Sequence, residues 1–394
     1  MRPSRRERLS IWTSSRKSAC KRAGWITGPS VCAGPYWKAI RGSNMTLFAP
    51  RAGRIVRSMR GPLLIAGAGA IGSVVGGLLA AAGSTVTLLG RRDHMDAVQA
   101  RGLAIDGLFG THRVSGLECA TAAGELGGPY RAIFLTVKAY DAAEMVDTVA
   151  PFLDRHGVLV CMQNGLGTLE PAVAAVGQAR VLGARVIFGA ELPEPGRATV
   201  TVCADPVLIG ALEPAADGQR ARAVAWASAL ADAGIPAAQT EAIVAELWGK
   251  VFYNAALNPL GALLDLPYGA LAEDPDSRAV MDLVIAEAFA VARAAGIALR
   301  WPDAGAYRAE FYGRLVPATA RHRSSMLQDL ARGRPTEIEA INGYVAARGA
   351  ALGVPAPTNA TLTRLIRARA RRVAHDATRS LEGERGTRAR SWNP

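Results

Sequence analysis

A lysine and two asparagines at intervals of four residues are the first groups that could do chemistry. Lys250, Asn254 and Asn258 share one face of a helix expected over Ala242–Asn258, and the residues between them are mostly apolar. Because Pro259 follows, we expect the helix to end or kink there. An ammonium and two amides on one stripe of an apolar helix are expected to face a cleft; binding of neighbouring backbone or solvent is the alternative.

A second polar cluster lies further along the chain, over 324–329 and 333–343. Thr336 could cap a helix expected over 336–350, with Glu339 completing a capping box. That pattern gives Thr336 and Glu339 structural roles and leaves Glu337 unexplained. Glu246, one helical turn before Lys250, could pair directly with that lysine.

A glycine-rich loop predicts a dinucleotide site. Residues 67–72 read Gly-Ala-Gly-Ala-Ile-Gly, between an expected strand at Leu63–Ala66 and an expected helix at Ser73–Ala82. The first glycine allows a tight turn, the second a close approach of a pyrophosphate, and the third close packing of helix on strand. The free N–H groups of the helix start then bind phosphate. The residues expected to contact the cofactor are Gly67, Gly69, Ala70, Ile71 and Gly72.

The residues that follow the second expected strand, Thr85–Leu89, are expected to determine whether NAD or NADP binds. A carboxylate at this point would bind the ribose hydroxyls of NAD. Gly90, Arg91 and Arg92 occupy it instead, and a guanidinium can bind a 2′-phosphate. The sequence therefore predicts NADPH/NADP, with Arg91 as the contact; solvated surface charge is the alternative for each arginine.

Two further strands are expected at Ala132–Val137 and Val158–Met162. Lys138 follows the first and Asn164 the second. Since ligands of open α/β sheets lie beyond the carboxyl ends of the strands, both side chains are predicted to contact the nicotinamide half of the cofactor.

The whole chain divides into an α/β Rossmann-type N-terminal domain and an all-α C-terminal domain. Residues 59–241 form the NADP-binding domain, with a β-rich stretch at 180–212. Residues 242–375 form the helical substrate and catalytic domain, which includes helices expected at 276–295 and 359–372. Residues 376–394 are expected to be a flexible tail.

The net positive charge of the 394-residue chain comes from its N-terminal end. The net charge is +13, and residues 1–60 hold 14 of the 46 Lys and Arg but one of the 33 acids. The remainder is neutral, which argues against a nucleic-acid groove. Residues 1–58 are a basic extension, a transit peptide or the product of a start assigned too early, with Met45 and Met59 as candidate starts.

Residues 61–90 carry no charged side chain and resemble a membrane span by length alone. Eight glycines and two β-branched runs instead indicate a buried βαβ unit, so we expect no membrane partner. Five cysteines without a CxxC pair fit a reducing compartment, here the cytoplasm, and five scattered histidines predict no metal site.

Four motifs in this order resemble the ketopantoate reductase family: the loop at 67–72, Gln-Asn-Gly at 163–165, the row from Lys250 to Leu260, and the segment from Ser324 to Ile338. The resemblance covers about residues 60–372. It implies NADPH-dependent reduction of ketopantoate, a 2-oxo acid, to pantoate on the route to pantothenate and coenzyme A. By this resemblance Lys250 and Glu337 are catalytic, and the substrate and cofactor contacts are Asn164, Asn254, Asn258 and Ser325.

Three alternatives remain at this stage. The nearest is a reductase of another 2-oxo acid, since the family includes members with other substrates. A non-catalytic NADP-binding sensor and a basic nucleic-acid binder are the others, and the sequence argues against both. The expected partner is a small 2-oxo acid rather than a nucleic acid or a membrane, and a homodimer is possible.

Overall fold

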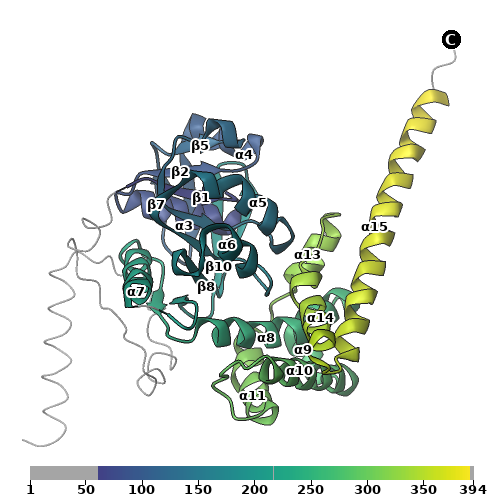
Figure 1. Ribbon diagram of the computed structural model, residues 1–394. Helices are drawn as coiled ribbons and strands as arrows, with labels where there is room; N and C mark the ends of the chain where they lie inside the picture. Colours follow the sequence, from purple (N-terminus) through teal and green to yellow (C-terminus); the bar gives the residue numbers. More distant parts are fainter. Residues whose placement is uncertain (1–60, 216, 391–394) are drawn as a thin grey trace, which may run out of the picture. The chain divides into compact units, whose positions relative to one another are not determined.

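The computed structural model describes residues 61–215 and 217–390 of the chain, so the predictions for residues 1–58 lie outside the described residues. The described residues all belong to one unit, Thr46–Pro394. An α/β part runs to strand β12 (Ala237–Gln239), and a helical part begins with α8 (Ile243–Leu264) (Figure 1). This order confirms the predicted Rossmann-type domain followed by a helical domain.

The larger sheet has eight strands in the order β12-β11-β8-β7-β6-β1-β2-β5. Neighbours are parallel except for β11 and β8, which pair antiparallel. The strand β1 lies between β2 and β6, so the strand order reverses there, which is where open α/β sheets bind ligands. The other bounds are β1 Leu63–Ala66, β2 Val86–Leu89, β5 Glu118–Ala120, β6 Tyr130–Leu135, β7 Leu153–Cys161, β8 Val181–Arg185 and β11 Val207–Ala211.

A second, four-stranded sheet has the order β4-β3-β10-β9 and packs on helix α3. The β-rich stretch expected at 180–212 therefore divides between the two sheets, with β8 and β11 in the larger one. The strands of the four-stranded sheet are β3 Leu103–Gly107, β4 His112–Val114, β9 Phe188–Glu194 and β10 Arg197–Cys203. The connecting helices are α3 Ala70–Ala81, α4 Arg92–Arg101, α5 Ala142–Val149, α6 Leu169–Val176 and α7 Asp217–Asp232.

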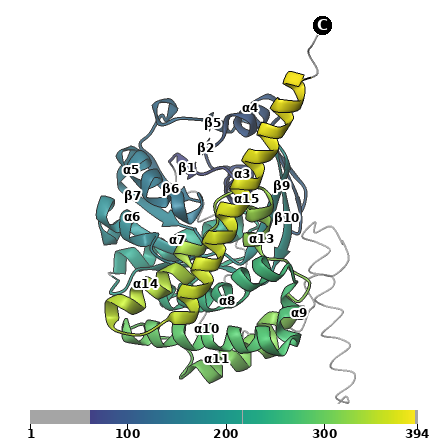
Figure 2. The ribbon, with the colours of Figure 1, turned by 90° about the vertical axis from the view of Figure 1, so that its right-hand side faces the viewer.

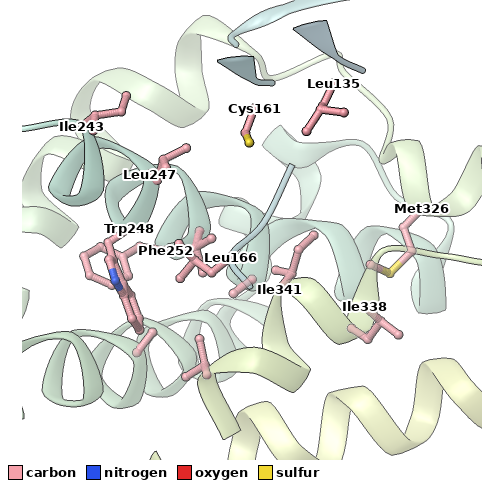
Figure 3. Packing of buried hydrophobic residues seen from close by; sticks show 14 of the residues in the cluster. Leu135, Cys161, Leu166, Ile243, Leu247, Trp248, Phe252, Met326, Ile338 and Ile341 are labelled. Atoms are coloured by element: carbon pink, nitrogen blue, oxygen red, sulfur yellow. The ribbon is translucent and has the colours of Figure 1, made fainter. Parts of the chain in front are cut away.

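Both faces of the larger sheet are buried, which explains its apolar strands. On β1, Leu63 and Ile65 join a cluster that includes side chains of α3 and α7, whereas Leu64 joins a cluster shared with the helical part. Figure 3 shows this shared cluster, in which Leu135 and Cys161 at the ends of β6 and β7 lie in the same core as residues of α8. The core therefore continues from the sheet into the helical part.

Helix α8 carries the predicted Lys–Asn–Asn row and differs from the prediction at its end. It continues through Pro259 to Leu264. A proline leaves the carbonyl four residues earlier without its helical partner. That carbonyl, on Ala255, accepts a hydrogen bond from the buried Asn342 side chain at 3.1 Å. A residue 87 positions later in the chain thus satisfies the group that the proline frees, which is why the helix does not end there.

The remaining helices surround α8, which packs against α10 (Pro275–Ala294), α13 (Ser325–Ala331) and α15 (Pro357–Arg390) (Figure 2). The helix expected at 336–350 is wrong in its start: a 3₁₀ turn, η8 (Ile338–Ala340), precedes α14 (Asn342–Leu352). The expected capping box is wrong too, because the carboxylate of Glu339 pairs with Arg367 of α15 instead. The other helices are α9 Tyr268–Glu273, α11 Ala304–Glu310, α12 Val316–Ala318 and, with π geometry, η7 Phe311–Leu315.

Helix α15 reaches Arg390 and so includes most of the segment predicted to be a tail. Within the described part of the chain, no helix combines the length and the apolar character needed to cross a membrane.

Candidate active site

The glycine loop sits at the reversal of strand order and has the shape that a dinucleotide needs. Gly67 has φ +108°, and a Cβ there would lie 2.5 Å from the backbone nitrogen of Val137, at the end of β6. A Cβ at Gly72 would lie 2.4 Å from the carbonyl oxygen of Gly67. Both glycines are therefore needed for the loop to close on the sheet.

Gly69 differs from the other two glycines of the loop. It is exposed, and a Cβ there would approach only the Gly67 carbonyl oxygen, at 4.0 Å. It is also the N-cap of α3, and no side chain caps the free N–H groups that follow at Ala70, Ile71 and Gly72. Open space in front of uncapped N–H groups fits a bound pyrophosphate. The predicted loop residues thus fit the phosphates of a nicotinamide dinucleotide.

Arg91 stands beside this loop. A Cβ at Gly90, which follows β2, would lie 3.0 Å from the Cβ of Ala68 in the loop. Arg91 comes next as the exposed N-cap of α4, while Arg92 donates to the Thr121 hydroxyl at 3.3 Å. Burial and Glu144 raise the pKa of Asp141, and the charge of Arg91 opposes that rise, so the guanidinium faces the chain after β6. Arg91 thus stands exposed beside the loop, whereas Arg92 is bound to Thr121.

Lys250 projects from α8 toward the ends of two strands. Its Nζ donates to the side-chain oxygen of Asn164, which follows β7, and to the carbonyl of Val186, which follows β8. Burial lowers the pKa of Lys250 to about 8, Glu337 opposes that shift, and Arg185 adds to it. The ammonium of Lys250 therefore lies at the carboxyl edge of the sheet, and its pKa is closer to neutral pH than that of an exposed lysine.

Glu337 connects the two parts of the chain. Its carboxylate is buried, accepts the backbone N–H of Ala139 at 3.2 Å and accepts the Asn164 amide at 3.4 Å. The Nζ of Lys138 lies 3.4 Å from the same carboxylate. Glu337, Asn164, Lys138 and Lys250 are thus brought together in one cluster, and the cofactor contacts expected of Lys138 and Asn164 stay predictions.

Asp329 is a member of this cluster that sequence reasoning did not assign. It is buried and binds Lys138 at 2.8 Å and Arg334 at 2.9 Å. Burial lowers the pKa of Lys138, but Glu337 and Asp329 more than offset it, so the pKa is raised. The available signal was its position one helical turn after Ser325, in the polar segment at 324–329.

Glu246 has a partner other than Lys250. Its carboxylate lies 3.4 Å from the guanidinium of Arg185, which also pairs with Asp205. The i,i+4 pairing of Glu246 with Lys250 that the sequence allowed is therefore not the arrangement found, and Glu337 is the acid whose charge acts on Lys250.

Asn254 and Asn258 follow Lys250 on α8, and Ser324 and Ser325 lie at the start of α13, which packs against α8. Asn254 is 8% exposed, and Asn258 is 5% exposed. The side-chain oxygen of Asn258 accepts from the Tyr268 hydroxyl at 2.6 Å, which leaves its amide N–H groups as donors. Ser324 is fully buried, caps α13 and donates to the Asn258 carbonyl at 2.9 Å. Ser325 is the partly buried first residue of α13.

This arrangement offers a titratable ammonium, amide and hydroxyl donors and a buried carboxylate beside a dinucleotide loop. Such donors stabilise charge that develops on a carbonyl oxygen and bind a carboxylate. Among residues 61–215 and 217–390, no group of three or more His, Cys, Asp or Glu side chains could hold a metal ion.

Both parts of the chain match family models. Residues 63–214 match the model described as Ketopantoate reductase PanE/ApbA, and residues 242–370 match Ketopantoate reductase PanE/ApbA C terminal. A 2-dehydropantoate 2-reductase of Aquifex aeolicus is 35% identical over 306 residues, covering 78% of this chain and 96% of that protein. The 2-dehydropantoate 2-reductase of Pyrococcus horikoshii is 32% identical over 307 residues, covering 78% and 97%.

Solved structures agree with this assignment. A PanE/ApbA family ketopantoate reductase from Ralstonia eutropha JMP134 has a TM-score of 0.70 at 31% identity, covering 79% of this chain and 99% of that one. A D-mandelate dehydrogenase with NADH and anilino(oxo)acetate has a TM-score of 0.71 at 25% identity, covering 79% and 99%. With family models matched over both parts and close relatives along most of its length, the chain belongs to the ketopantoate reductase family and is an oxidoreductase.

Proposed function

We propose that this chain reduces 2-dehydropantoate (ketopantoate) to pantoate with NADPH, in the supply of pantothenate and coenzyme A. The observation that carries the proposal is Lys250, whose Nζ is held by Asn164 and the Val186 carbonyl at the carboxyl edge of the sheet. Relatives that are 30–35% identical and named 2-dehydropantoate 2-reductase support the substrate. Ketopantoate reductases are NADPH-dependent, and the exposed Arg91 beside the loop supports that cofactor here.

Different residues of the chain bind different parts of the cofactor. Gly67, Gly69 and Gly72 shape the loop for the pyrophosphate, and the N–H groups at the start of α3 bind it. Arg91 binds the 2′-phosphate. When bound, the nicotinamide supplies the hydride for the carbonyl carbon of the substrate.

Lys250 acts on the carbonyl oxygen of the substrate. Its ammonium stabilises the negative charge that develops there and then donates the proton that completes the alcohol. With a pKa of about 8 it is about nine-tenths protonated at pH 7 and still close enough to neutrality to release the proton. Glu337 keeps the ammonium charged, and Asn254, Asn258 and Ser325 supply donors for the substrate carboxylate and its neighbouring oxygen.

The test is NADPH oxidation by the purified full chain with ketopantoate, beside a panel of 2-oxo acids that includes phenylglyoxylate. We expect the highest kcat/KM with ketopantoate. A higher value with an aryl 2-oxo acid would favour the second candidate, a reductase of another 2-oxo acid, which the likeness to D-mandelate dehydrogenase supports. Cofactor binding without turnover of any 2-oxo acid would contradict both and favour a sensor.

A further inference from the structure

Arg185 is a largely covered cation that the proposed mechanism does not use. It is the last residue of β8, and its side chain is 11% exposed. Its guanidinium pairs with Asp205, which precedes β11, and lies 3.4 Å from Glu246 on α8. A cation so little exposed is costly unless it is paired, so its two carboxylates are required partners.

The position of Arg185 relates it to Lys250 in two ways. The next residue, Val186, provides the carbonyl that accepts from Lys250 Nζ. Glu246 lies one helical turn before Lys250 on the same helix. The end of β8 is therefore joined to one turn of α8 by two adjacent contacts, Arg185 to Glu246 and Val186 to Lys250.

We propose that Arg185 is a positioning residue for Lys250, because it keeps the Glu246 carboxylate away from the lysine and holds the Val186 carbonyl where the ammonium donates. The inference rests on the proposed role of Lys250 as proton donor. Without Arg185, the Glu246 carboxylate loses the partner that holds it away from Lys250, and it becomes able to compete with Asn164 and Val186 for the ammonium by i,i+4 pairing, a common arrangement on helices. The lysine would then be bound by its own helix instead of facing the substrate.

The charges that face Lys250 come from three elements. Glu337 acts on the lysine from the segment before η8 and Arg185 acts on it from β8, whereas Glu246, on α8 itself, lies against Arg185. Arg185 lowers the pKa of the ammonium directly, and it also neutralises Glu246. Its loss removes a positive charge and exposes a negative one, and both changes favour the protonated lysine.

The decisive variant is Arg185→Met, tested by the pH dependence of kcat/KM in both directions. Reduction needs protonated Lys250 and should decline above about pH 8 in the native enzyme, whereas oxidation of the hydroxy acid with NADP needs the neutral form and should rise there. In Arg185→Met we expect both inflections to move up by about one pH unit. A role limited to folding would lower both rates without moving either inflection.

Two milder variants keep the proposal testable if Arg185→Met folds poorly. Arg185→Lys retains the charge and should keep the inflections near their native positions. Glu246→Gln removes one of the two carboxylates that pair with Arg185 and should move the inflections down, opposite in sign to Arg185→Met. The double variant Arg185→Met with Glu246→Gln should return toward the native profile.

Arg197→Met is the matched control, because Arg197 also pairs with one aspartate and one glutamate, Asp106 and Glu194, but on the smaller sheet. Its pH profiles should equal the native ones. Unmoved inflections in both Arg185→Met and Glu246→Gln would overturn the proposal. Lys250→Ala separates this failure from failure of the proposed function: if Lys250→Ala turns over normally, the role of the lysine itself is wrong.

Discussion

The two sides of the proposed site differ in whether backbone groups or side chains form them. The phosphate side is made of backbone, with Gly67, Gly69 and Gly72 shaping the loop and one exposed arginine beside it. The side around Lys250 is made of side chains from distant parts of the sequence, which contact one another directly. A backbone site depends on a few φ angles, whereas a side-chain site depends on every member of its network. We therefore expect single substitutions to have larger and more coupled effects around Lys250.

The largest effect is expected for Lys250→Ala, which should reduce turnover by about 10²–10⁴-fold while NADPH still binds. Glu337→Ala should lose turnover on a similar scale but no more than Lys250→Ala. Lys250→Arg should not rescue activity, because a guanidinium hardly releases its proton. Turnover and NADPH affinity, measured separately for each variant, check these expectations.

Glu246→Ala is the control for that series, measured at pH 7 or below. It should cost little turnover there, because Glu246 pairs with Arg185 and not with the lysine. Near-normal turnover in Lys250→Ala would remove the basis of the mechanism. A severe loss in Glu246→Ala alone would transfer the role of the carboxylate to Glu246.

On the phosphate side, Arg91→Ala should raise the KM for NADPH about ten- to a hundredfold, as expected for one lost charged hydrogen bond. The KM for NADH should hardly change, because NADH has no 2′-phosphate. Arg92→Ala, whose side chain contacts Thr121, is the control and should leave both values near native. Equal losses with both cofactors in Arg91→Ala would show that Arg91 does not bind the 2′-phosphate.

Two glycines of the same loop should respond differently to alanine. A Cβ at Gly69 meets open space, so Gly69→Ala should keep the native Tm and weaken NADPH binding several-fold by crowding the pyrophosphate. A Cβ at Gly72 would lie 2.4 Å from a backbone oxygen, so Gly72→Ala should lower Tm as well. Calorimetry and cofactor titration separate the two effects. Native cofactor affinity in Gly69→Ala would contradict the proposed place of the phosphates.

The smallest expected effect is a loss of stability at acid pH from the phosphate side. The Nδ1 of His94 on α4 accepts the backbone N–H of Gly196 at 3.0 Å, and its Nε2 bonds the Ser73 hydroxyl of α3 at 2.9 Å. Burial lowers the pKa of His94 below its ordinary value of 6.5. The unfolded chain therefore binds a proton at higher pH than the folded one, and stability falls as the pH drops below about 6.5. Tm should fall by a few degrees toward pH 5, and less so in His94→Gln.

The same contrast explains what could be predicted from the sequence. Local signals were enough for β1, the glycine loop and the helix that follows it, because strand, turn and helix start follow from adjacent residues. They failed at Pro259. The helix continues there because Asn342, 83 positions further on, donates a hydrogen bond to the carbonyl that the proline leaves without a partner. They also missed Asp329, because nothing in its neighbourhood shows that Lys138 and Arg334 meet there.

The bond from Asn342 to the Ala255 carbonyl has a consequence for how the chain folds during its synthesis. One core cluster contains only residues between 63 and 235, so the α/β part can pack before the rest is made. Helix α8 is different, because its freed carbonyl depends on Asn342, which is itself bound by Asn359. At typical translation rates, about 5–20 s pass between synthesis of Ala255 and Asn359. The cofactor half can therefore form on the ribosome well before the lysine-bearing helix is complete.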